Sequence, residues 1–235
     1  MHGRSSCEEP TGPALRETAR VLTAGDVLDP VLHRLRAGNG PTAAQWCRAP
    51  GATSRVRATL VHDGVALEVG DSAFGVSRAS PLALPLRTRS VDRIAVPLLL
   101  PLLHDMSGLF TELRRVLAPH GLLSVLLPAP ASFGWRGGEL RRAVRASWRH
   151  RSAVEHPEWL ASSADFAVLA DDRLDFTLDG AAGAGAADAD RPAAVADLCG
   201  AGVYPPELPA SARAGLVAHR TAAHRVRLRR IVARR

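Results

Sequence analysis

Two apolar segments near the middle of the chain give its clearest pattern of hydrophobic and polar positions. Residues 92–100 and 121–127 are almost continuously apolar, which is typical of strands buried on both faces of a sheet. Between them, residues 106–117 repeat apolar side chains at helical spacing, and Pro119 and Gly121 end the repeat. This order predicts an α/β unit in which two adjacent, central, parallel strands are joined by a right-handed helical crossover.

The chain before this unit begins as a helical lead-in. Residues 13–24 and 24–36 predict two short helices, and the glycine- and proline-containing segment 37–41 ends the second. We therefore divide the chain into a lead-in, residues 1–40, and an α/β domain, residues 41–235. Three further elements are expected ahead of the central unit: a short strand over 43–48, a helix over 54–61 and a strand over 65–70.

The second half of the chain alternates helical and extended patterns. A low-complexity segment, residues 180–190, predicts a flexible surface loop. The remaining elements expected are helices over 138–151, 157–163, 191–198 and 210–219, one interrupted strand or a strand pair over 168–178, and a final antiparallel strand over 225–233. Together they predict a Rossmann-like α/β fold: a mainly parallel twisted sheet with helices on both faces and a terminal antiparallel strand.

Composition narrows the class of protein. Of the 235 residues, 46% are hydrophobic and 23% are charged, so the chain can bury a sizeable core. The longest apolar run, residues 94–103, is half a bilayer span and contains two prolines, which argues against a transmembrane helix. The first nine residues lack the apolar stretch of a signal peptide. We therefore expect a cytoplasmic protein that does not associate with membranes.

All 30 basic residues are arginines, and basic and acidic residues are concentrated in different segments of the chain. Residues 136–151 hold six arginines and one acid, residues 153–210 hold eleven acids and two arginines, and residues 220–235 hold seven arginines and no acid. These blocks can pair inside the fold. Alternatively, a predicted helical face can bind an acidic protein or RNA. That face consists of Arg141, Arg142, Arg145 and Arg149.

Three motifs in the middle of the chain resemble the class I S-adenosylmethionine-dependent methyltransferases, of the kind called methyltransferase type 11. Residues 65–72, VALEVGDS, are similar to the family strand that ends in an acidic residue at the cofactor ribose. Residues 84–92, LPLRTRSVD, are similar to the family pattern L-P-x-x-x-x-S-x-D. Residues 112–123, ELRRVLAPHGLL, match E-x-x-R-V-L-x-P-x-G-x-L and are the most specific of the three.

The resemblance implies S-adenosylmethionine as cofactor and an unidentified small molecule as methyl acceptor. At the place of the family's glycine-rich motif, residues 46–52 keep one glycine, and the position of its adenine-contacting acid holds serine. A catalytically inactive, methyltransferase-like scaffold is therefore the alternative. The cofactor-binding residues that the resemblance implies are Ala49, Gly51, Asp71, Ser72, Ser80 and Pro97.

Other polar groups have a structural interpretation beside a functional one. Asp71 can cap a helix that begins near Ser72 instead of binding ribose, and Asp105 can cap the helix that follows it. Cys47 is interpreted as a buried thiol rather than a nucleophile, because no histidine lies near it in the sequence. The histidines show no metal-ligand spacing, so no metal site is predicted, and no catalytic residue is identified.

Overall fold

The fold is taken from a computed structural model, which describes residues 30–48, 56–61, 64–69, 72–76, 79–129, 138–178, 190–219 and 225–235. In its first half lie α3 (Pro30–Arg34), β1 (Leu35–Arg36), α4 (Ala43–Trp46), β2 (Val56–Val61), β3 (Gly64–Val69), β4 (Ser72–Val76), β5 (Val91–Pro97), the 3₁₀ turn η1 (Leu100–Leu102), α5 (Met106–Val116) and β6 (Leu117–Pro128). In its second half lie α6 (Gly138–Ala146), α7 (Arg151–Glu155), α8 (Pro157–Ser163), β7 (Ala167–Leu178), α9 (Asp190–Gly200), α10 (Ala210–His219) and β8 (Arg225–Arg234).

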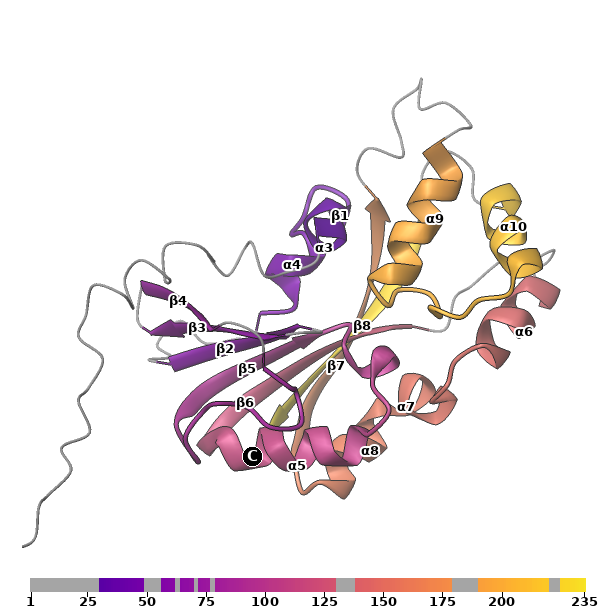
Figure 1. The fold of residues 1–235 in the computed structure, drawn as a ribbon. Helices are drawn as coiled ribbons and strands as arrows, with labels where there is room; N and C mark the ends of the chain where they lie inside the picture. The colour runs from indigo at the N-terminus through magenta and orange to yellow at the C-terminus, as the bar shows by residue number, and fades with distance from the viewer. Residues whose placement is uncertain are drawn as a thin grey trace, which may run out of the picture.

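The strands form one twisted eight-stranded sheet in the order β1-β7-β8-β6-β5-β2-β3-β4 (Figure 1). The predicted central unit is confirmed, because β5 and β6 are parallel neighbours joined by α5. The terminal antiparallel strand is confirmed as β8, which lies between β6 and β7. The α/β, Rossmann-like class is therefore correct. However, only β2, β5 and β6 pair in parallel, and the other five pairings are antiparallel, so the sheet is mixed rather than mainly parallel.

Two elements before the central unit differ from their prediction. Residues 43–46 form helix α4 instead of a strand, because the Thr42 side chain accepts a hydrogen bond from the Gln45 backbone and the Gln45 side chain accepts one from the Thr42 backbone. Residues 56–61 form strand β2 instead of a helix. The buried side chains of Ala58 and Leu60 alternate with less buried ones, which is the period of a strand.

The expected helix after Ser72 is strand β4, which pairs antiparallel with β3. The predicted helix over 138–151 is divided into α6 and α7, while α8 and the helices in 191–198 and 210–219 are confirmed. The extended segment 168–178 is one strand, β7. The predicted helix over 13–24 lies outside the described residues, and so does the predicted loop over 180–190 except for Asp190, which begins α9. Within the described part of 24–36 lie α3 and β1.

Helices cover both faces of the sheet, as predicted. In Figure 1, α5 and α8 lie below the sheet, and α3, α4, α9 and α10 lie above it. The lower core packs Ile94, Leu109 and Leu123 together, while the upper core contains Leu32 and Phe176. Among the described helices, none is long and apolar enough to cross a membrane.

Candidate functional site

The carboxyl ends of the parallel strands are where an open α/β sheet usually binds its ligand. Pro97 ends β5 at this edge and is buried. The next residue, Leu98, has a positive φ of 52° and donates its backbone N–H to Leu126 O on β6, at 2.9 Å. This sharp turn directs the chain into η1 and then to the start of α5.

The segment that follows α9 fills the space beside this turn. Residues 201–204 are all buried, and a Cβ added to Gly202 would lie 2.7 Å from Leu98 O. Gly202 also has a φ of +76°, so two independent constraints require glycine here. The carboxyl end of β5 is thus packed against the protein's own backbone at the position where a ligand would lie.

Polar side chains at this edge hold loops together. The Asp105 side chain accepts a hydrogen bond from Gly108 N at 2.7 Å, which confirms Asp105 as the cap of α5. The exposed His104 Nε2 accepts from Arg149 Nη1 at 2.7 Å, because an arginine can only donate, and Arg149 also pairs with Glu207.

Of the three predicted cofactor residues that the structure describes, Ser72 and Pro97 lie at opposite ends of the strand ladder. Ala49, Gly51 and Asp71 lie outside the described residues. Ser72 opens β4 opposite Val69, which in turn pairs with Val56 at the amino end of β2. Pro97 lies at the carboxyl edge instead, five residues along the ladder, or roughly 16 Å at the usual rise of a strand. Since β3 runs antiparallel to β2, the end of β3 does not face the crevice that the resemblance implies.

Ser80, the remaining predicted residue, lies in an exposed turn. Its carbonyl accepts from Ala83 N at 3.0 Å, and its hydroxyl oxygen accepts from Leu82 N at 3.3 Å. These bonds give Ser80 a local role in the turn that leads towards β5.

The residues that carry the most specific motif have a structural role. The Glu112 carboxylate, almost buried in α5, accepts hydrogen bonds from Leu84 N at 2.6 Å and from Arg115 at 2.7 Å. Arg115 in turn donates to Leu84 O and Leu86 O, at 3.1 and 2.9 Å. The hydrogen bond from Arg115 lowers the pKa of Glu112. The motif at residues 112–123 therefore contacts the motif at residues 84–92, and its Glu112 and Arg115 side chains hold that segment in place.

Two more residues of these motifs, Asp92 and Gly121, also have structural roles. The Asp92 carboxylate accepts from Val56 N at 2.9 Å, which fixes the start of β2 against β5. A Cβ added to Gly121 would lie 2.9 Å from Ala118 O, so the glycine allows the turn into the paired part of β6. The resemblance singles out these positions in the sequence, whereas their structural roles depend on contacts that appear only in the fold.

Acidic and basic segments of the chain pair with each other in the structure. On the neighbouring strands β7 and β8, aspartates pair with arginines at 2.7 Å; the pairs are Asp171–Arg229, Asp172–Arg230 and Asp175–Arg227. Of the predicted arginine face, Arg145 pairs with Glu155 at 2.6 Å and Arg149 with Glu207. Arg141 and Arg142 are exposed.

Cys47 is buried, and its thiol donates to Ala44 O at 3.1 Å. Burial raises the pKa of this thiol to about 12, so almost none of it is the reactive thiolate at neutral pH. The interpretation as a buried structural thiol is therefore supported. Within the described part of the chain, no three His, Cys, Asp or Glu side chains are grouped to hold a metal ion.

No protein-family model and no curated protein matches the sequence. Several solved methyltransferase structures are similar to this chain, with low sequence identity and low TM-scores. A candidate methyltransferase from Bacillus halodurans has a TM-score of 0.39 and 12% identity over 67% of this chain and 69% of its own. An S-adenosylmethionine-dependent methyltransferase from Methanosarcina mazei has a TM-score of 0.39 and 12% identity over 82% and 75%. Geranyl diphosphate C-methyltransferase from Streptomyces coelicolor has a TM-score of 0.34 and 13% identity over 67% and 51%. A function must therefore be argued from this chain's own residues.

Proposed function

We propose that this chain is a degenerate, methyltransferase-like protein that binds a partner and does not use S-adenosylmethionine in the manner of the family it resembles. The observation that carries this proposal is the hairpin between β2 and β3. Val61 pairs with Gly64, so two residues connect the strands. A nucleotide-type site needs a glycine-rich turn and a helix after the strand, and a crossover to a parallel strand needs a dozen or more residues.

The carboxyl edge supports the same proposal. The buried segment 201–204 packs against Leu98, and the His104 side chain, just before α5, is hydrogen-bonded to Arg149. Neither feature offers the open crevice with convergent polar groups that is usual for a small-molecule site.

The test is a calorimetric titration of the purified protein with S-adenosylmethionine. We expect no saturable heat up to millimolar ligand. Saturable binding in the micromolar range would refute the proposal and favour a working methyltransferase, for which the intact β5–α5–β6 unit with its family motif is the specific support. In that case Asp71→Ser would weaken binding at least tenfold if Asp71 holds the ribose, since hydrogen bonds to a charged group contribute about 1.5–3 kcal/mol.

For the partner we propose an acidic protein or RNA segment at the exposed end of α6. Because Arg145 and Arg149 pair with Glu155 and Glu207 of the same chain, Arg141 and Arg142 supply the available positive charge of that face. The probes are a fluorescein-labelled oligoglutamate and a single-stranded RNA of equal charge, measured by anisotropy at low salt. The double variant R141Q/R142Q should lose binding to at least one probe, whereas R87Q/R89Q, which changes two other exposed arginines, should not. Equal binding by both variants would overturn this assignment of the surface.

A further inference from the structure

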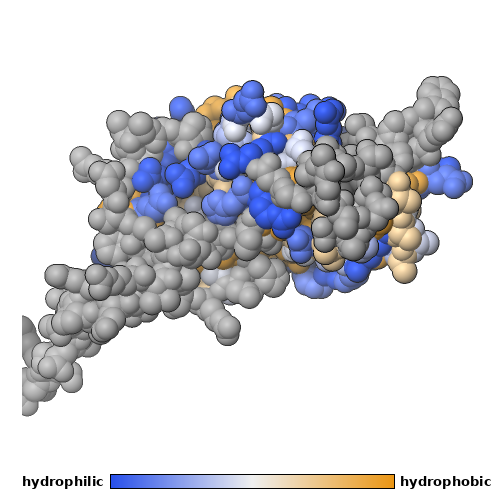
Figure 2. Space-filling model, turned by 90° about the horizontal axis from the view of Figure 1, so that it is seen from above, coloured by the Kyte–Doolittle hydropathy of each residue, from blue (hydrophilic) through white to orange (hydrophobic). Residues whose placement is uncertain are grey.

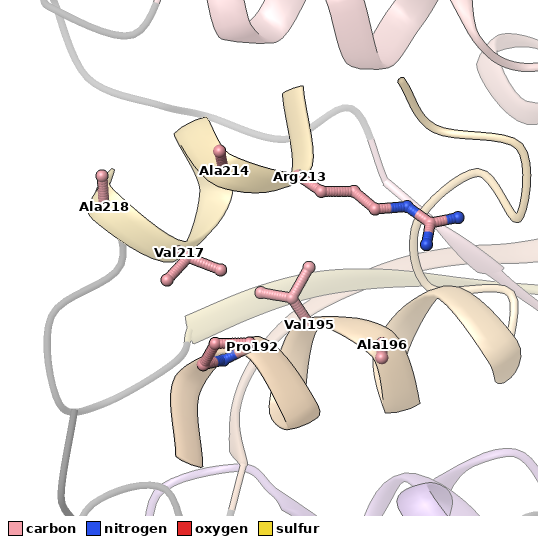
Figure 3. Close-up of a pocket in the computed structure, with 7 residues that line it drawn as sticks. All are labelled: Pro192, Val195, Ala196, Arg213, Ala214, Val217 and Ala218. Atoms are coloured by element: carbon pink, nitrogen blue, oxygen red, sulfur yellow. The ribbon is translucent and has the colours of Figure 1, made fainter. Parts of the chain in front are cut away.

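We propose that the groove between α9 and α10 binds a small amphipathic carboxylate, namely an apolar chain or ring that carries one negative charge. The groove has a volume of about 580 Å³, within the range of roughly 300–1,000 Å³ typical of small-molecule sites. Figure 3 shows that the lining side chains come from the two helices and that Val195 and Val217 point into the space between them. They are Pro192, Val195, Ala196, Arg213, Ala214, Val217 and Ala218.

The walls suit an apolar ligand. Six of the seven lining residues are aliphatic or proline, and three of them are alanines whose short side chains leave space between the helices. Below this space, Val195 is buried and belongs to the upper core, so the floor is fixed by packing. Seen from above in Figure 2, hydrophobic residues reach the surface towards the right-hand end, the side on which α10 lies in Figure 1.

Arg213 gives the groove its one charge, and the loop after α9 holds it in place. Its Nε donates to Leu208 O at 3.0 Å, and its Nη2 donates to Pro206 O at 2.8 Å. The guanidinium extends past Ala196 at one end of the groove (Figure 3). Two backbone carbonyls thus orient the side chain before any ligand arrives, which reduces the entropy lost on binding.

The guanidinium of Arg213 still has donors to offer. A guanidinium carries five N–H groups, and the two carbonyls use two of them. Among the described residues no carboxylate lies within ion-pair distance of Arg213, in contrast to Arg227, Arg229 and Arg230, each of which faces an aspartate. An oriented arginine with free donors beside an apolar groove is complementary to a carboxylate with an apolar tail.

One charge beside apolar walls also argues against a polyanion. RNA would need several cations along its backbone, and Arg213 is the single charged residue that lines this groove. The groove lies between two helices above the sheet, and none of the residues that the resemblance assigns to the cofactor lines it. The inference therefore holds whether or not the protein binds S-adenosylmethionine.

The experiment uses the full chain and the fluorescent fatty acid 11-(dansylamino)undecanoate. We expect a saturable, blue-shifted increase in dansyl fluorescence, and we expect decanoate to displace the probe at lower concentration than 1-decanol. Arg213→Gln should weaken binding about tenfold to a hundredfold, because charge-assisted hydrogen bonds of about 1.5–3 kcal/mol are lost. Arg213→Lys, which keeps the charge, should recover part of the affinity and shows that the effect is not a loosened loop.

Two further variants locate the site. Ala214→Trp, at an exposed position of α10, should block the groove and abolish the signal, whereas Arg87→Gln removes an equal charge elsewhere and should leave it unchanged. Thermal unfolding of each variant checks that it is folded. The proposal is overturned if the probe does not bind saturably or if Ala214→Trp binds it as well as the parent does. It is also overturned if Arg213→Gln binds the probe like the parent and 1-decanol displaces it as well as decanoate does.

Discussion

The buried Arg229 predicts a specific loss of stability when one of its partners is neutralised. The Arg229 side chain is 4% exposed, and it donates twice to Asp171 at 2.7 Å, once to Glu158 and once to Glu155 O. Breaking a buried ion pair costs about 3–5 kcal/mol when the remaining charge is left unpaired. Here Glu158 remains and Asp171 is 33% exposed, so we expect Asp171→Asn to cost about 2 kcal/mol.

The measurement is urea unfolding at pH 7, together with thermal unfolding, where 2 kcal/mol corresponds to about 4–8 °C for a chain of this size. The matched control is Asp175→Asn. Asp175 lies on the same strand and also pairs bidentately, with Arg227 at 2.7 and 2.8 Å, but the two side chains are 59% and 41% exposed. Exposed pairs contribute less than about 1 kcal/mol. If both variants lose the same stability, the reasoning from burial is wrong.

The same pair predicts how stability depends on pH. The hydrogen bonds from Arg229 lower the pKa of Asp171 in the folded protein. A carboxyl group with a lowered folded-state pKa contributes its stability above its unfolded pKa, and this contribution is lost as the pH falls through the folded value. The difference between the parent and Asp171→Asn should therefore shrink in acid. A constant difference down to pH 2 would contradict this account.

Three further predictions rest on single residues. Hydrogen bonds from Arg145 and Arg151 lower the pKa of Glu155 from 4.5 to about 2, so Glu155→Gln should lower the melting temperature at pH 7, and the deficit should vanish between pH 4.5 and 2. Gly202→Ala should cost more than about 1–2 kcal/mol in urea unfolding, because a strained φ and a clash with Leu98 O add together. Gly38→Ala, with positive φ but open space, should cost only the strain, and Gly200→Ala should cost nothing. Cys47 should resist dithionitrobenzoate at pH 8 in a Cys7→Ser background until the protein is unfolded, since it is buried with a pKa of about 12.

The central fold could be predicted because its signals are local and strong. The apolar strands β5 and β6 and the amphipathic helix α5 show their periods directly in the sequence, and a right-handed crossover leaves one arrangement for them. The final strand β8 was predictable for the same reason, since its apolar side chains stand out among arginines.

The hairpin of β2 and β3 could not be predicted with the same rules. Residues 56–61 contain both alanine and β-branched residues, so their pattern fits a helix or a strand, and only pairing with β5 decides between them. The resemblance then favoured a parallel strand ending in Asp71, whereas the pairing of Val61 with Gly64 makes that strand antiparallel. The signal that could have revealed the hairpin is the polar pair His62-Asp63, followed by Gly64, between two apolar runs.

Strand pairing explains why arginines are concentrated in the last segment of the chain, although it leaves the net charge of +7 unchanged. A net charge of +7 suggests a polyanion as partner when it is read from composition alone. In the structure, Arg227, Arg229 and Arg230 of β8 instead face aspartates of β7, more than fifty residues away in the sequence. Changes at these paired residues of β7 and β8 should therefore alter stability rather than binding. Binding is better sought at arginines that the fold leaves without an acidic partner among the described residues, of which Arg213 lines a groove.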